Sequence, residues 1–348
     1  MWEKPMGNIV RFALVGAGSM GRNNGRRIVA DGRGRIVAVA DPDKANAALA
    51  AKEFGAKAAY GSVEALLKSK TAFDAAVVST TNITHAPVSI ALLNAGKSVY
   101  CEKPLAYDAA AAAAVVEAER NAKGVFMVGY NQRFDPWAQY AKDQIEKGRL
   151  GRIYHAQTQW HRRLWIATFG RWFTDKKISG GGPLIDIGVH RLDQTLWLMG
   201  CPRALSVSAV TYDALAKGVS KRLKKSYSVE EFAAALIRLE GGASILLQAS
   251  YLSYLPLEHP EMSTLLMGTA CGFYQSGQSL RIVSNKDLEP SDTILQTFPK
   301  PKATVMGHFI DCVLTGRKPM CTAEQGLAVA RILDAIYQSA ASGEEVTL

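Results

Sequence analysis

A predicted strand, a glycine-rich turn and a predicted helix follow one another near the start of the chain. The apolar run 11–15 leads directly into Gly16-Ala17-Gly18-Ser19-Met20-Gly21. In this order Gly16 allows a tight turn, Gly18 lets the backbone approach a pyrophosphate, and Gly21 lets helix and strand pack closely. The first N–H groups of the helix then face the phosphates. The stretch predicts an α/β unit whose dinucleotide site includes Gly16, Gly18, Ser19, Met20 and Gly21.

A carboxylate follows the second predicted strand. The strand 36–40 ends in Asp41, twenty residues after Gly21. At this position a carboxylate accepts hydrogen bonds from the adenosine ribose hydroxyls. Asp41 favours NAD over NADP, because its charge would repel a 2′-phosphate. Arg22 and Lys44 are near enough in sequence to keep NADP possible.

Helices and strands keep alternating up to about residue 130, which is typical of a parallel sheet with crossover helices. We expect helices at 44–54, 63–67, 85–94 and 108–121, and strands at 75–79, 98–101 and 125–130. After that point the pattern changes to a helix at 136–147 and a run of strands at 153–160, 205–212, 231–239, 243–253, 262–267, 271–275 and 280–283. Helices at 305–314 and 323–340 end the chain. Strands grouped in this way predict an α+β domain with a large open, mostly antiparallel sheet.

Two polar stretches follow strands of the first sheet, at the carboxyl ends where open α/β sheets bind ligands. The stretch 80–85, Thr-Thr-Asn-Ile-Thr-His, is predicted to be a loop with His85 opening the next helix. The second stretch is Glu102-Lys103-Pro104. Lys103 is either a surface lysine before a proline turn or a cation that holds or deprotonates a reacting hydroxyl. The residues expected at the cofactor are Thr80, Asn82, His85, Glu102 and Lys103.

A second glycine-rich turn, Gly180-Gly181-Gly182-Pro183, leads into an apolar run that reads as a buried helix. If this helix begins near Asp186, then Asp186 and His190 lie four residues apart on one face. A carboxylate and an imidazole placed in this way can orient a hydroxyl and move its proton. The alternative is a carboxylate near a helix N-terminus followed by an ordinary core histidine. The stretch 180–194 alone does not decide between these two interpretations.

Three of the six tryptophans lie between Trp160 and Trp172, in a predicted loop. Aromatic faces pack on the C–H surfaces of sugars, and arginines donate to hydroxyls, carboxylates or phosphates. Equally, the tryptophans could bury the loop against the sheet or a neighbouring subunit. The candidate substrate contacts are Arg163, Trp165 and Trp172, and Tyr251, Tyr254 and His259 are candidates for a further wall.

The composition of the chain argues against several classes of protein. The chain has 348 residues, 48% of them hydrophobic and 21% charged, as in a globular protein with room for two cores. No apolar run approaches the roughly 20 residues that span a bilayer, and residues 1–8 lack a signal-peptide core, so we expect a cytoplasmic protein. Five scattered cysteines argue against a disulfide framework or a zinc site. The net charge of +10 is spread out, and its densest cluster, at 217–225, reads as a solvated loop rather than a nucleic-acid surface.

Several motifs together resemble the Gfo/Idh/MocA family, the relatives of glucose-fructose oxidoreductase and inositol dehydrogenase. They are Gly16-x-Gly18-x-x-Gly21, Asn82-x-x-His85, Glu102-Lys103-Pro104, Gly129-Tyr-Asn-Gln-Arg-Phe134 and Asp186-x-x-x-His190. The resemblance runs from about residue 9 to the final helix. It implies a Rossmann domain over 1–130 and a substrate-binding and oligomerisation domain over 131–348, whose last helix packs back toward the first domain.

The resemblance also implies an activity. It is that of an NAD(P)-dependent dehydrogenase that reversibly oxidises a secondary hydroxyl of a sugar, sugar derivative or cyclitol, without a metal. Lys103 and His190 would share the proton transfer, and Asp186 would anchor a hydroxyl and support the imidazolium. A homodimer or homotetramer would form through the C-terminal sheet, with no nucleic-acid or membrane partner. The alternatives are an NAD-retaining redox-cycling glycosidase or lyase, a sugar–sugar oxidoreductase, and a non-catalytic dinucleotide-binding regulator.

Overall fold

The computed structural model describes residues 9–286 and 288–348. Residues 1–8, on which the signal-peptide expectation rests, lie outside this range. The chain divides into two compact units. The first comprises Met1–Gly129 and Ala303–Leu327, and the second comprises Tyr130–Lys302 and Ala328–Leu348.

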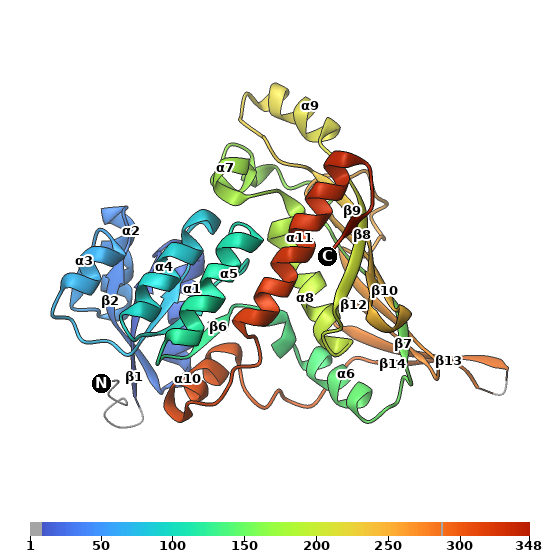
Figure 1. The fold of residues 1–348 in the computed structure, drawn as a ribbon, viewed down its shortest axis with the longest axis horizontal. Coiled ribbons are helices and arrows are strands. Elements are labelled where there is room, and N and C mark those ends of the chain that lie inside the picture. The colour runs from blue at the N-terminus through green and yellow to red at the C-terminus, as the bar shows by residue number, and fades with distance from the viewer. Residues whose placement is uncertain (1–8, 287) are drawn as a thin grey trace. The chain divides into compact units, whose positions relative to one another are not determined.

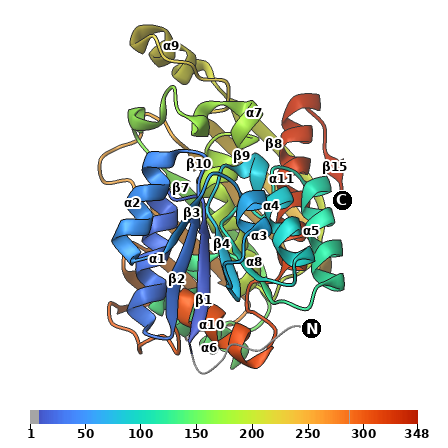
Figure 2. The same cartoon turned by 90° about the vertical axis from the view of Figure 1, so that its left-hand side faces the viewer.

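The first unit is built on a six-stranded parallel sheet in the order β3-β2-β1-β4-β5-β6 (Figures 1 and 2). In Figure 2 α1 and α2 lie on one side of its strands, and α4 and α5 lie on the other. The strands are β1 Val10–Val15, β2 Gly34–Ala40, β3 Ala58–Tyr60, β4 Ala75–Val78, β5 Ser98–Cys101 and β6 Phe126–Val128. The helices are α1 Ser19–Asp31, α2 Lys44–Phe54, α3 Val63–Lys68, α4 Asn82–Asn94, α5 Ala109–Asn121 and α10 Val305–Thr315.

Side-chain caps explain where several of these helices begin. The Asp43 carboxylate accepts from Ala45 N–H at 2.8 Å, and the Asp108 carboxylate accepts from Ala111 N–H at 2.7 Å. Both caps satisfy an N–H group that has no partner inside the helix. The helix α4 is an exception to the sequence-based expectation. It begins at Asn82 rather than His85, after Thr81 in extended backbone, so half of the predicted polar loop is the first turn of a helix.

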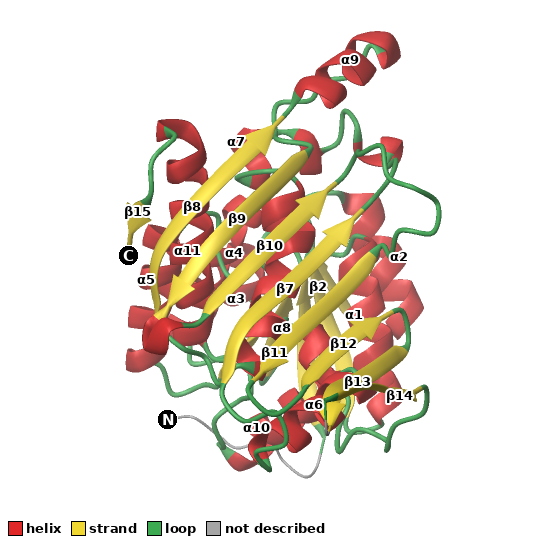
Figure 3. Cartoon of the chain, turned by 90° about the vertical axis from the view of Figure 1, so that its right-hand side faces the viewer, coloured by secondary structure: helices red, strands yellow, loops and turns green. Residues whose placement is uncertain are grey.

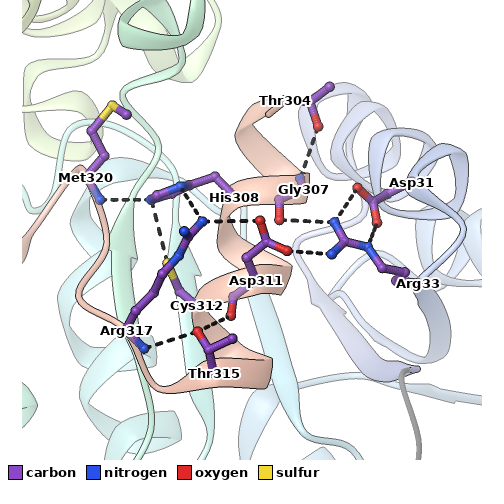
Figure 4. Close-up of polar contacts among 10 residues, drawn as sticks. All are labelled: Asp31, Arg33, Thr304, Gly307, His308, Asp311, Cys312, Thr315, Arg317 and Met320. Carbon is purple, nitrogen blue, oxygen red and sulfur yellow. Dashed lines mark hydrogen bonds and ion pairs between the residues drawn. The ribbon is translucent and has the colours of Figure 1, made fainter. Parts of the chain in front are cut away.

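The segment carrying α10 is attached to the rest of the first unit through charged side chains (Figure 4). Arg33, at the start of β2, donates to both Asp31 and Asp311. Asp311 also accepts from Arg317 at 3.1 Å, and Met320 N–H donates to the His308 ring at 2.9 Å. These contacts link α10 to the end of α1 across more than 270 residues of sequence.

The second unit contains a nine-stranded sheet in the order β14-β13-β12-β11-β7-β10-β9-β8-β15 (Figure 3). Every neighbouring pair is antiparallel except β7 and β10. Its strands are β7 Ile153–His161, β8 Ala204–Tyr212, β9 Phe232–Leu239, β10 Ser244–Ser250, β11 Met262–Gly268, β12 Gly272–Ser276, β13 Ser279–Lys286, β14 Glu289–Leu295 and β15 Val346–Thr347. Its helices are α6 Pro136–Glu146, α7 Lys176–Ser179, α8 Val189–Leu198 and α9 Ala214–Leu223, and α11 Ala323–Ser342 runs from the first unit into the second. The predicted combination of a Rossmann-type sheet and a mostly antiparallel sheet is confirmed.

The sequence did not predict several elements of the second unit, among them α7, α9, β14 and β15. The basic stretch that read as a loop is mostly the helix α9, which ends at Leu223 before Lys224 in left-handed backbone. Its lysines and arginine are exposed, but the stretch is helical because the Glu231 carboxylate accepts from Leu215 and Ala216 N–H at 3.2 and 2.8 Å. The strand β14 is largely polar and exposed, and β15 spans two residues, so neither carries the apolar alternation that predicts a strand.

Buried charges support α8 inside the second unit. Arg133 and Asp193 are each about 1% exposed, and Arg133 Nε donates to Asp193 at 2.9 Å. Arg191, also fully buried, donates to Gln132, to Gln275 and to Thr264 on β11. Burial lowers the pKa of Arg191 to about 10, and burial raises the pKa of its neighbour Asp135 to about 6. The helix that carries His190 is thus fixed by polar contacts as well as by apolar packing.

Candidate active site

The glycine-rich turn after β1 has the geometry that its sequence predicts. Gly16 has a φ of +88°, and a Cβ there would overlap the Ser79 carbonyl. A Cβ on Gly21 would overlap the carbonyl of Gly16, so helix and turn pack too closely for any side chain. By contrast, a Cβ on Gly18 would meet no atom within 4 Å. Ser19 and Met20 are exposed, and no side chain caps α1. An uncovered backbone at a helix N-terminus fits the phosphates of a dinucleotide.

Asp41 lies at the carboxyl end of β2 and is 8% exposed. One carboxylate oxygen accepts from Ala17 N–H at 2.6 Å, and the other accepts from Asp43 N–H at 2.8 Å. These bonds hold the carboxylate against the glycine-rich turn. Each carboxylate oxygen has further acceptor capacity, so the position suits a ribose hydroxyl. Arg22, which kept NADP open, lies 3.9 Å from Glu53.

The segment after β4 supports the segment after β5. The His85 ring is 1% exposed, with Nδ1 2.7 Å from the Pro104 carbonyl and Nε2 3.2 Å from the Thr80 carbonyl. Burial lowers the pKa of His85. Asn82 is buried one turn earlier on α4. His85 therefore joins the backbone of its own segment, at Thr80, to the residue that follows Lys103, and a contact of His85 or Asn82 with a cofactor stays a prediction.

Glu102 and Lys103 lie where β5 ends, and the Lys103–Pro104 peptide is cis. Glu102 is 8% exposed, and its carboxylate accepts from Asn24 on α1 at 2.7 Å and from Lys103 N–H at 3.3 Å. Burial raises the pKa of Glu102. Asn24 was not predicted from the sequence, because nothing in its neighbourhood on α1 marks a partner 78 residues away. Glu102 thus ties the segment carrying Lys103 to the helix that follows the glycine-rich turn.

The second glycine-rich turn leads into a π-helical turn, Leu184–Gly188, before the α-helix α8 begins. Asp186 therefore lies in a wider turn than the plain α-helix that the sequence suggests, and π-helical turns are frequent at functional sites. Asp186 is 8% exposed and accepts from the Tyr251 hydroxyl at 2.7 Å. The Trp160 ring lies 5.7 Å from the His190 ring, centroid to centroid. The carboxylate therefore contacts Tyr251, and the half-buried imidazole contacts Trp160.

The aromatic residues around Asp186 form one cluster. Tyr251 packs with Ile187 and Ala249, and Trp160 and Trp165 pack against this group. Trp165 meets the Tyr251 ring edge-on at 4.8 Å, and Trp172 stacks on Phe173 at 3.8 Å. The sequence indicates Tyr251 only as a candidate for a further wall of the site and does not predict its hydrogen bond to Asp186.

The other candidate substrate contacts, Arg163, Tyr254 and His259, differ in their burial and in their neighbours. The Arg163 side chain is exposed, whereas the guanidinium of its neighbour Arg162 lies 4.4 Å over the Trp165 ring and 3.5 Å from Glu261. Tyr254 is 84% exposed. His259 packs edge-on against His161 at 5.6 Å. Of the two arginines, the geometry favours Arg162 as the one associated with the aromatic cluster.

Two further features concern the residues that the structure describes. No group of three or more His, Cys, Asp or Glu side chains within 9–286 and 288–348 is arranged to hold a metal ion. Across the same residues, no helix has both the length and the apolarity needed to cross a membrane.

Comparisons with known proteins identify the family to which both parts of the chain are similar. The family model for the oxidoreductase family with an NAD-binding Rossmann fold matches residues 10–130, and the model for the C-terminal α/β domain of that oxidoreductase family matches residues 142–348. The chain is 26% identical to the D-glucoside 3-dehydrogenase of Escherichia coli, with 97% of both chains covered. It is 25% identical to the inositol 2-dehydrogenase of Rhizobium meliloti, with 97% of this chain and 99% of the relative covered.

Among solved structures, levoglucosan dehydrogenase in complex with NADH and levoglucosan has the same fold, with a TM-score of 0.83 at 23% identity. The match covers 97% of this chain and 99% of that one. The two family models together span both units of the chain. The protein therefore belongs to the Gfo/Idh/MocA family of oxidoreductases.

Proposed function

We propose that the protein is an NAD(P)-dependent dehydrogenase that reversibly oxidises a secondary hydroxyl of a sugar, a sugar derivative or a cyclitol. The observation that carries the proposal is the placement of a buried carboxylate, Asp186, four residues before an imidazole, His190, with the Tyr251 hydroxyl bonded to the first and the Trp160 ring beside the second. The relatives are named for glucoside, inositol and levoglucosan, and these compounds all carry secondary hydroxyls on a ring. Aromatic faces beside acid–base groups suit such rings.

Each candidate side chain has a role in this proposal. Asp186, fixed by the Tyr251 hydroxyl, accepts a hydrogen bond from a substrate hydroxyl and supports the positive charge on His190. Lys103 and His190 share the removal of the hydroxyl proton, as the family resemblance implies. Trp165 and Trp172 supply apolar faces, with Arg162 and Arg163 as donors toward substituents. The bound nicotinamide supplies the hydride acceptor.

Of the two nicotinamide cofactors, NAD and NADP, we propose NAD. Asp41 presents a carboxylate where a 2′-phosphate would bring further negative charge. Arg22 lies 3.9 Å from the Glu53 carboxylate, so part of its positive charge is already offset within the protein. We therefore propose that NAD is used in preference to NADP.

The direct test uses purified protein, both cofactors and a panel of aldoses, glycosides, inositols and anhydrosugars. Absorbance at 340 nm is expected to rise with NAD and at least one panel member. Lys103→Met and His190→Ala should abolish turnover and leave NADH binding intact. No change in either direction with any substrate would contradict the dehydrogenase. NAD that stays bound through purification, together with turnover that needs no added cofactor, would favour the redox-cycling alternative.

The second sheet supports a proposal about assembly. The residues Ser208, Leu236, Leu246, Gln157, Leu265 and Tyr274 are paired in register across six strands. Alternate residues of β10, such as Ile245 and Leu247, are buried on the opposite face, while Leu246 stays half-exposed. In Figure 3 no helix is drawn over the face of these strands that is turned to the viewer. We propose that two copies, or two pairs of copies, meet through this half-exposed apolar face.

Light scattering on the purified protein tests the assembly. The expected species is a dimer or tetramer, and Leu246→Glu should lower its mass without unfolding the chain. We also propose a cytoplasmic location, because all five cysteines are free thiols, which suits a reducing compartment.

A further inference from the structure

A buried carboxylate closes the turn that precedes Asp186. Glu230 is 8% exposed, and its carboxylate accepts from Gly182 N–H at 2.9 Å and from Leu184 N–H at 3.2 Å. It also accepts from the Tyr337 hydroxyl on α11 at 2.9 Å. Three donors thus converge on one carboxylate, and two of them are backbone groups at the start of the helical segment that carries Asp186.

The glycines of this turn are required by the same contact. A Cβ on Gly181 would overlap the Tyr337 hydroxyl, and a Cβ on Gly182 would overlap the backbone oxygen of Glu230. Gly180 is in left-handed backbone, with a φ of +87°. Two of the three glycines therefore let the turn approach Glu230 and Tyr337 closely.

The contact also sets the electrostatics of the helical segment. The first N–H groups of a helix lack partners inside it and carry partial positive charge. Here the Glu230 carboxylate satisfies the Leu184 N–H group at the start of the π-helical turn and the Gly182 N–H group just before it. Burial raises the pKa of Glu230, while the backbone donors oppose that shift. The carboxylate form is the one that can accept from all three donors at once.

We propose that Glu230 is a positioning residue: its carboxylate fixes the start of the π-helical turn and thereby the placement of Asp186 and His190. This proposal rests on the proposed function, since it assigns Glu230 to the support of the acid–base pair. Asp186 lies two residues after Leu184, and its N–H donates to the Gly182 carbonyl at 3.1 Å. A shift of the turn would therefore move the carboxylate that Tyr251 holds.

The neighbouring residue provides a matched control. Glu231 is also a buried carboxylate and also caps a helix, but the helix is α9, through Leu215 and Ala216 N–H. Glu230→Gln and Glu231→Gln therefore make the same chemical change at adjacent positions. Of the two carboxylates, only that of Glu230 accepts hydrogen bonds from the segment that carries Asp186.

Steady-state kinetics with the full-length protein and its best panel substrate is the first readout. A misplacement of about 1 Å costs on the order of 100-fold in rate. Glu230→Gln is expected to lower kcat by about 10- to 100-fold with little change in KM. Glu230→Asp keeps the charge and should recover part of the loss, and Glu231→Gln should stay near wild type. Equal kcat values for Glu230→Gln and Glu231→Gln would overturn the proposal.

Hydrogen exchange is the second readout and needs no substrate. In Glu230→Gln the amides of Gly182 and Leu184 should exchange faster than in wild type, while exchange in 16–31 is unchanged. Unchanged exchange at both amides would overturn the proposal even if activity fell. If Glu230→Gln does not fold, Tyr337→Phe, which removes one of the three donors, must show a smaller change in the same direction. If wild type turns over no panel member, the proposed function fails while exchange still reports on Glu230.

Discussion

Two glycine-rich turns lead into helices in this molecule, and they differ in the anion that their N–H groups meet. The turn before α1 has no side-chain cap, and the space over Gly18 is open. The turn before α8 is closed by the protein's own carboxylate, Glu230. The same sequence signal thus has two uses. The first turn gives its Ala17 N–H group to Asp41 but leaves the N–H groups at the start of α1 without a side-chain cap, as the phosphates of a ligand require. The second turn uses its N–H groups to fix a side chain nearby.

The largest expected effect tests how far the second turn depends on buried charges. Asp193→Ala leaves Arg133 buried without its carboxylate, and breaking such a pair costs about 3–5 kcal/mol. Chemical unfolding followed by tryptophan fluorescence is a suitable measurement, because five of the six tryptophans lie within 137–197. Asp143→Ala, which removes an exposed partner of Lys147, is the control and should leave the unfolding free energy unchanged. Similar losses in both variants would contradict the role of the buried pair.

The first turn can be tested by placing one methyl group at two positions. Gly21→Ala forces a Cβ against the Gly16 carbonyl and should lower stability by about 1–3 kcal/mol. Gly18→Ala meets no atom, so its thermal midpoint should match wild type while NADH binding weakens. Thermal unfolding and fluorescence titration with NADH separate the two effects. If Gly18→Ala bound NADH normally, the open space over this glycine would not be a phosphate site.

A smaller effect is expected at the hydroxyl that holds Asp186. Tyr251→Phe removes one hydrogen bond, worth about 0.5–1.5 kcal/mol, so kcat should fall by roughly 2- to 10-fold. Tyr254→Phe, at an 84% exposed position, is the control and should behave as wild type. Equal kinetics in the two variants would show that Asp186 needs no such support.

The last prediction concerns pH. Burial raises the folded-state pKa of Asp135 to about 6, above the unfolded value of about 3.9. The folded state therefore holds this proton more tightly, and its contribution to stability is full below pH 4 and is lost as pH rises through 6. Asp135→Asn should remove that loss, so its stability relative to wild type should increase between pH 4 and pH 7. A constant difference across this range would contradict the raised pKa.

The parts of the site made from backbone were readable in the sequence. Few structural requirements explain glycine at positions 16, 18 and 21 together. The order of strand, turn and helix around them indicates that the requirement is a dinucleotide-binding turn. The same pattern predicts the place of Asp41, because this carboxylate directly follows the second strand, which pairs with the first. The parallel order of the first sheet follows from the alternation of helices and strands.

The parts made from distant side chains were not readable. The bonds from Tyr251 to Asp186, from Asn24 to Glu102 and from Gly182 to Glu230 join residues 65, 78 and 48 positions apart. No local period or propensity encodes such a partner. The helix α9 escaped for a related reason, because its cap is the carboxylate of Glu231, eight residues beyond its last turn.

The route of the chain restricts how this protein can be recombined with its relatives. The first unit is made from two separate stretches, and the later one, Ala303–Leu327, contributes α10 and the first residues of α11. A chimera that exchanged only residues 1–129 would combine Arg33 from one parent with Asp311 from another. Exchange of a nucleotide-binding unit therefore has to carry both stretches together, and a single crossover near residue 130 would separate partners that have to change as a pair.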